Sequence, residues 1–167
     1  MKLQEIDKSR YRKHLNRVIA ALIVSLMVMA LSFGQLLIML LGGDGDHFIF
    51  NLSGVVLAGG LCLWVLNRFR QHEFMTEVVY VWELKQGLNK IYRKLRKIEE
   101  AKEDGDLNAL VILNFYYAAS SQLFKLDDNT ITMDSLQLEV NKLQQLIEDK
   151  GLNVKTEDYR PSMLKAF

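Results

Sequence analysis

Two long apolar runs separated by a short turn constrain this sequence more than any other feature. The runs occupy residues 18–41 and 48–66, and neither contains a charged residue. A helix rises about 1.5 Å per residue and the hydrocarbon core of a bilayer is about 30 Å thick, so about 20 apolar residues can cross it. The sequence therefore predicts two transmembrane helices, at residues 18–41 and 48–66, joined by a short periplasmic turn at residues 42–47.

The first apolar run could instead be the core of a signal peptide, because a basic segment precedes it. A signal core typically has about 7–15 apolar residues. The run at residues 18–41 has 24 uncharged residues and is followed almost at once by a second apolar run. Its length therefore favours a membrane anchor that stays on the mature protein.

The charges along the chain predict the orientation of this hairpin. Residues 1–17 carry six basic and two acidic side chains, whereas the only charges in residues 18–66 are Asp44 and Asp46 in the turn. Arg68 and Arg70 follow the second run. Because basic residues stay on the cytoplasmic side of a membrane, we expect residues 1–17 and the C-terminal part to be cytoplasmic.

Two polar side chains interrupt the apolar runs. Gln35 and Asn51 lie at similar depth in an antiparallel hairpin, and we expect a hydrogen bond between them, within one chain or between copies. The alternative is that water near the interface satisfies each side chain. Neither run contains Asp, Glu, Lys, Arg or His, which ion and proton pathways usually require. The sequence therefore argues against a channel or carrier.

Residues 67–151 have the pattern of a soluble, helical cytoplasmic domain. The expected helices cover about residues 71–103, 107–126 and 132–150, with aspartates or glycines at their ends. The first has a seam of apolar residues spaced three and four apart, and the second is apolar around most of its circumference. The fold class is therefore all-α: a transmembrane hairpin followed by a three-helix bundle or coiled-coil-like domain, with residues 152–167 as an extended tail. The candidate packing seam consists of Leu84, Leu88, Ile91 and Leu95.

The first cytoplasmic helix also carries the densest basic group of the chain. This group is a candidate surface for a partner protein or for anionic lipid. It would lie about 30 Å from the membrane on a straight helix, so lipid binding requires a bend. The alternative is a solvated face balanced by nearby glutamates. The basic group consists of Lys90, Arg93, Lys94, Arg96 and Lys97.

Chemistry-bearing motifs are absent from the sequence. It contains no Walker, dinucleotide-binding, nucleophile-elbow or zincin pattern, and its three histidines are scattered. The single cysteine, Cys62, cannot form an intrachain disulfide. We therefore assign no catalytic, cofactor-binding or metal-binding residue and expect no cofactor. The candidates for a polar site are Asn114, Tyr116, Tyr117, Ser120 and Ser121, for which core packing is the simpler interpretation.

The segment KLQEIDKSRYRKHLNRVI, the hairpin, and the stretches NKIYRKLRKIEEA and NALVILNFYY together resemble the DUF3087 family of small proteobacterial inner-membrane proteins. The resemblance covers nearly the whole chain. It implies residence in a bacterial cytoplasmic membrane, and it supplies no activity, substrate or site.

These observations favour a non-enzymatic, membrane-anchored interaction or scaffold protein. Membrane lipid, further copies of the chain, and a cytoplasmic or membrane protein are the expected partners, whereas nucleic acid is not expected. One alternative is a regulatory relay in which the hairpin senses the state of the membrane. Another is an enzyme that acts on a lipid or a small molecule, which would require a polar pocket around the central helix.

Overall fold

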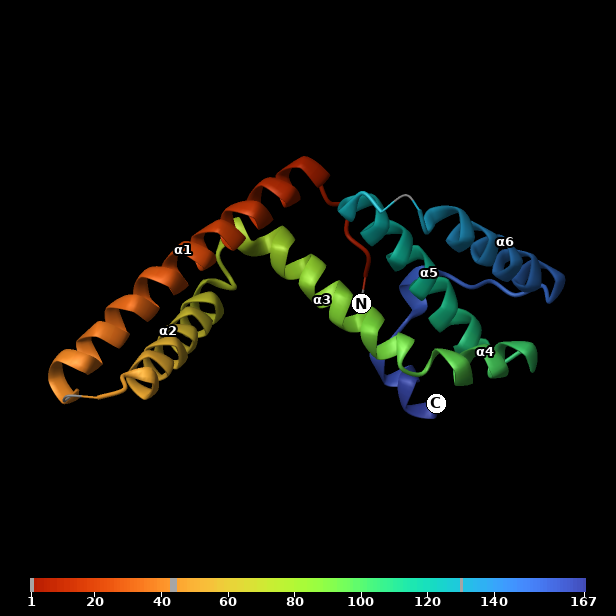
Figure 1. The fold of residues 1–167 in the computed structure, drawn as a ribbon. Helices are drawn as coiled ribbons and strands as arrows, with labels where there is room; N and C mark the ends of the chain where they lie inside the picture. The colour runs from red at the N-terminus through yellow and green to blue at the C-terminus, as the bar shows by residue number, and fades with distance from the viewer. Residues whose placement is uncertain (1, 43–44, 130) are drawn as a thin grey trace. The chain divides into compact units, whose positions relative to one another are not determined.

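The computed structural model describes residues 2–42, 45–129 and 131–167, and every regular element within them is helical (Figure 1). The all-helical prediction is confirmed. The chain forms two compact units: a hairpin unit, Ser9–Val79, and a helical unit made of Met1–Lys8 with Tyr80–Phe167. The elements are α1 (Lys8–Leu41), α2 (Phe48–Phe69), η1 (Glu73–Met75), α3 (Thr76–Tyr92), α4 (Leu95–Glu103), α5 (Leu107–Asp127), α6 (Met133–Asp149), η2 (Thr156–Asp158) and η3 (Pro161–Ala166).

In the hairpin unit, α1 and α2 run side by side in opposite directions (Figure 1). They approach each other closely at glycine: a Cβ atom on Gly54 would lie 2.5 Å from the backbone nitrogen of Gly34 and 2.9 Å from the carbonyl oxygen of Ala30. Small residues permit this approach because no side chain separates the two backbones. The contact fixes the register of the hairpin.

The outer surfaces of these two helices remain apolar and exposed. Only 6% of the most apolar stretch of α1 and 17% of that of α2 is buried within the protein. A helix in the core of a soluble protein would be mostly buried. By length and composition, both helices could cross a membrane. α1 also begins at Lys8, so most of the basic segment before residue 18 is helical.

Gly54→Ala tests this backbone contact. The added methyl group meets the backbone of α1, which cannot move aside easily, so we expect the hairpin to lose about 1–3 kcal/mol relative to Gly60→Ala. Gly60→Ala is the matched control, because a Cβ there has no neighbour within 4 Å and the gain in helix propensity is the same. Thermal unfolding of the full chain in detergent micelles, followed by circular dichroism, measures the difference. Equal midpoints for the two variants would contradict the close contact.

The helical unit is organised around α5. The side chain of Asp106 caps this helix by accepting a hydrogen bond from the backbone N–H of Ala109, at 2.9 Å. The helix ends at Asp127 and is followed by Asp128 in the left-handed conformation. Most of its side chains are buried around the full circumference, as its apolar composition predicts. It packs against α4, α6, η2 and η3. Two polar pairs join it to α3: Tyr80–Gln122 at 3.1 Å and Lys85–Asp127 at 2.8 Å.

The structure divides the helix expected at residues 71–103 into η1, α3 and α4. The break falls at Lys94, whose backbone (φ −113°, ψ 3°) leaves the helical region. The Lys94 side chain donates a hydrogen bond to the carbonyl oxygen of Leu164 at 2.7 Å, so the C-terminal segment packs at the break. The helices expected at 107–126 and 132–150 correspond to α5 and α6 to within a residue or two.

The expected extended tail is folded onto α5. The ring of Tyr159 stacks on that of Phe115 with the centroids 4.2 Å apart, and Tyr159 is only 2% exposed. Leu164, in η3, is also buried. At the other end of the chain, the backbone N–H of Gln4 donates to the hydroxyl of Tyr80 at 2.9 Å. Both terminal segments therefore complete the helical unit.

Candidate functional site

The predicted packing seam lies inside the helical unit. Leu84 and Ile91 are fully buried, Leu88 is nearly so, and Leu95 is half-buried after the break between α3 and α4. These side chains therefore form part of the core of their own chain. Their burial leaves little apolar surface on the seam for another copy.

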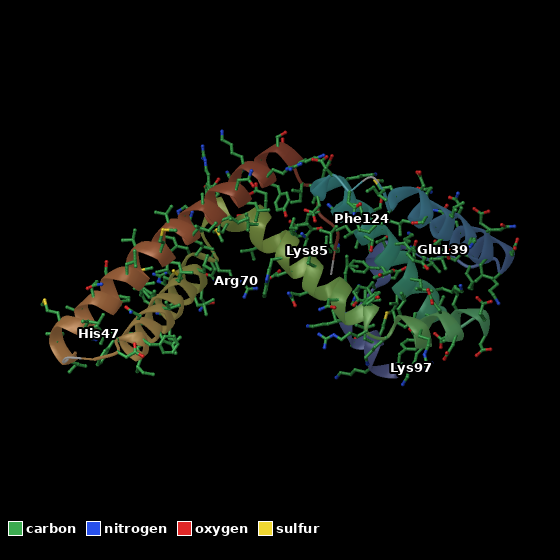
Figure 2. The ribbon with its side chains drawn as sticks, viewed as in Figure 1. His47, Arg70, Lys85, Lys97, Phe124 and Glu139 are labelled. Atoms are coloured by element: carbon green, nitrogen blue, oxygen red, sulfur yellow. The ribbon has the colours of Figure 1, made fainter. Side chains whose placement is uncertain are left out.

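The basic group surrounds the break between α3 and α4. Arg93, Lys94, Arg96 and Lys97 line a hollow of about 270 Å³, and Lys90 is exposed on α3. Lys97 lies on α4 (Figure 2). Arg96 has Glu100 as an ion-pair partner at 3.8 Å, but both side chains are largely exposed. Such a pair contributes little energy, so the hollow keeps a net positive charge that can attract an anionic surface.

The structure brings together three of the five polar candidates on α5. Asn114, Tyr117 and Ser121 line a pocket of about 340 Å³ between α5 and α6, to which Gln137 and Gln144 also contribute. Tyr116 and Ser120 are not part of its lining. The three candidates and the two glutamines that line the pocket all carry amide or hydroxyl groups. The pocket can therefore hydrogen-bond a polar molecule, but these groups supply no acid or base that titrates near neutral pH.

Burial raises the pKa of Tyr117 to about 12, and the negative charge of Glu99 adds to the effect. Burial likewise raises the pKa of Tyr116 and Tyr159. The phenols therefore stay protonated in the folded chain at pH values where they ionise in the unfolded chain. Such a group contributes stability that is fully present below pH 10 and is lost as the pH rises through the folded pKa.

We therefore expect the wild-type chain to lose stability between about pH 10 and pH 12, and Tyr117→Phe to lose less over the same interval. Denaturant unfolding at pH 8 and pH 11 measures the two losses. Tyr92→Phe, at an exposed tyrosine, is the control and should lose nearly as much stability as wild type, because Tyr92 makes only a secondary contribution to the raised pKa of Tyr116. A loss in Tyr117→Phe equal to that of wild type would show that Tyr117 is not the group responsible.

A charged cluster that no sequence pattern predicted lies at one end of the hairpin unit. The buried carboxylate of Glu77, in the first turn of α3, is 2.8 Å from Arg10 Nε and 3.3 Å from His14 Nδ1. The ring of His14 stacks on that of Phe74, with the centroids 4.1 Å apart. A buried carboxylate needs such partners to offset its loss of hydration. The spacing of Arg10 and His14, one helical turn apart, was the available signal, but nothing identified their distant partner.

The two polar residues of the apolar runs, Gln35 and Asn51, lie in different surroundings in the structure. Asn51 packs against Gly34, where a Cβ atom would be 2.9 Å from Asn51 Oδ1. Gln35, the next residue along α1, is exposed. The hydrogen bond between Gln35 and Asn51 stays a prediction.

Metal-binding side chains do not gather in the part of the chain that the structure describes: no three of its His, Cys, Asp and Glu residues are placed to hold an ion. Asp44, a residue of the predicted periplasmic turn, lies outside the described residues. Asp46 is described and accepts a hydrogen bond from the backbone N–H of Phe48 at 2.9 Å.

The elements together define an all-helical protein with two apolar helices long enough to span a membrane and a helical unit centred on α5. Residues 1–164 match the family described as protein of unknown function (DUF3087), and the chain belongs to this family. The resemblance noted from the sequence is thereby confirmed. Comparison with curated proteins and with solved structures finds no match.

Proposed function

We propose that this chain is a non-enzymatic, membrane-anchored interaction protein of the bacterial inner membrane. The observation that carries the proposal is the apolar surface of α1 and α2, which is long enough to cross a bilayer and mostly not buried by the protein. Exposing so large an apolar surface to water is unfavourable, whereas a bilayer accepts it. In an α-helix every backbone polar group between the ends is satisfied internally, as a bilayer requires.

The charges at the two ends of the hairpin support an orientation with both termini in the cytoplasm. Lys13 and Arg17 precede the apolar part of α1, and Arg68 lies in the last turn of α2. Figure 2 shows His47 and Arg70 at opposite ends of α2, and Arg70 is at the end that carries these basic residues. Basic residues are retained on the cytoplasmic side, so the end near His47 is the periplasmic one.

Single cysteines in a Cys62→Ser background test the topology. We expect Gly45→Cys to react with a membrane-impermeant maleimide in intact spheroplasts, because the turn is periplasmic. Ser9→Cys and Ser162→Cys should react only after lysis, because both termini are cytoplasmic. The three positions are exposed, so access alone decides the outcome. Labelling of Ser9→Cys in intact spheroplasts, or recovery of the chain in the soluble fraction, would overturn the proposal.

The basic group is the partner-facing surface that we favour. The residues of the packing seam are mostly buried in the core of the helical unit, whereas Arg93, Arg96 and Lys97 are exposed around a hollow. A partner with an acidic surface would be attracted to this group and positioned by it. Self-association, which we also propose, would then involve the exposed apolar faces of the hairpin, where lipid or another copy can pack.

Charge reversal tests the partner surface. Lys97→Glu should reduce the recovery of a cross-linked protein partner from intact membranes roughly fivefold, because reversal of an exposed charge costs about 1 kcal/mol. Lys125→Glu, an equally exposed reversal on α5, is the matched control and should leave recovery unchanged. Cross-linking followed by mass spectrometry measures both, and native mass spectrometry of the same membranes gives the oligomeric state. A monomer without any cross-linked protein would contradict an interaction role.

A regulatory relay is the second candidate, and the continuity of α3 favours it. Residues 76–79 of this helix belong to the hairpin unit and include Glu77, while its remaining residues belong to the helical unit and include Leu84 and Ile91. A shift at Glu77 could therefore be transmitted along one unbroken helix. A relay requires hydrogen exchange at Tyr116 and Tyr117 to change when the hairpin is altered, for example by Gly54→Ala. Unchanged exchange would exclude it.

A further inference from the structure

The two helices of the hairpin unit leave a groove at the end opposite the turn. They are in contact at Gly34 and Gly54, but between residues 18–29 of α1 and residues 61–69 of α2 lies a cavity of about 740 Å³. Phe74 and Met75, in η1, line the same cavity. Small side chains on the facing surfaces, Ala21 and Ser25 among them, leave the space open.

The lining of this groove is almost entirely hydrocarbon. Ser25, Cys62 and His72 carry the hydroxyl, thiol and imidazole groups of the lining, and the remainder are aliphatic, methionine or phenylalanine side chains. The volume falls within the range of about 300–1,000 Å³ that is typical of ligand sites. A volume of about 740 Å³ is less than that of two turns of a helix about 10 Å wide, whereas a flexible alkyl chain can lie along the whole groove.

Two arginines adjoin residues that line the groove. Arg17 precedes Val18, and Arg68 precedes Phe69, two residues of the lining. Of the nearby carboxylates, Glu77 is already held by Arg10 and His14, while Glu73 is exposed on η1.

His72 adds a hydrogen-bond donor at the same end of the groove. Its Nδ1 accepts from the backbone N–H of Phe74 at 3.1 Å, which places the proton of the neutral ring on Nε2. Nε2 can therefore donate to a ligand. A molecule with an apolar chain and an anionic head matches both this donor and the nearby arginines.

We propose that this groove binds one acyl chain of an anionic phospholipid, with the phosphate near Arg17, Arg68 and His72. This inference rests on the proposed membrane insertion of the hairpin. The alkyl chain lies along the lining of α1 and α2, and the head group lies at the basic end, on the cytoplasmic side. Bound lipid would thereby become part of the packing between α1, α2 and η1.

Filling the groove tests the proposal with the full chain in nanodiscs of phosphatidylethanolamine that contain phosphatidylglycerol as the minority lipid. Native mass spectrometry after release from the nanodisc counts the phosphatidylglycerol molecules retained. Ala21→Phe places a ring in the groove and should lower retention about tenfold, equivalent to about 1.4 kcal/mol. Ala20→Phe is the matched control: it lies on the same helix, is exposed and is not part of the lining, so retention should match wild type.

Two more variants keep the test independent of folding defects. Ser25→Leu fills the same groove with a smaller side chain and should also lower retention, with unchanged helicity by circular dichroism. Arg68→Gln should lower the preference for phosphatidylglycerol over phosphatidylethanolamine while a lipid is still retained. Equal retention in Ala21→Phe and Ala20→Phe would overturn the proposal. So would loss of a dimer in Ala21→Phe without any loss of lipid, which would assign the groove to a second copy.

The same preparation separates this proposal from the membrane proposal on which it depends. Resistance of the wild-type chain to carbonate extraction supports membrane insertion, whatever the groove binds. If the chain is inserted and retains no phosphatidylglycerol selectively, the groove proposal alone fails. If carbonate removes the chain from the membrane, both proposals fail.

Discussion

The burial of α5 is the interaction on which the helical unit depends. α4 and α6 are amphipathic, and each has only one apolar face to bury, while α5 offers apolar side chains on nearly all sides. The terminal segments pack on the same scaffold, through Gln4 at one end and Tyr159 at the other. Loss of α5 would therefore deprive α4, α6, η2 and η3 of their common packing partner. This arrangement explains why α5 has no charge before Lys125.

Hydrophobic periodicity predicted the helices well, because it records which faces must be buried. The start of α5 and the end of α6 could also be predicted from the sequence, because Asp106 and Gly151 are local capping signals. The break at Lys94 could not be predicted from the sequence. The helical spacing of apolar residues continues from Ile91 through Ile98, and both of these side chains are fully buried despite the break. A distant contact, the bond from Lys94 to the backbone of Leu164, lies at the break, and no local pattern reveals it.

In the candidate sites, too, features made by neighbouring residues could be predicted from the sequence, whereas features that depend on distant contacts could not. The basic group was visible in the sequence because its members are neighbours, but the hollow they line depends on the folded C-terminal segment. The tail was expected to be extended, since its single proline and short apolar stretches have no helical period. Stacking of Tyr159 on Phe115 stabilises the packing of the tail on α5. The partners of Glu77 were equally hidden, because more than sixty residues separate it from Arg10 and His14.

The position of Glu77 gives the start of α3 a defined electrostatic environment. The carboxylate lies in the first turn, where the helix dipole favours negative charge, and Arg10 compensates it from α1. Stacking of His14 on Phe74 adds an apolar contact to the same junction, because η1 directly precedes α3. The segment from Phe69 to Thr76 is thus held by polar and aromatic contacts, although it is short and has little helix of its own. The same η1 residues also line the groove between α1 and α2, so whatever occupies that groove packs directly against η1, the segment that immediately precedes α3.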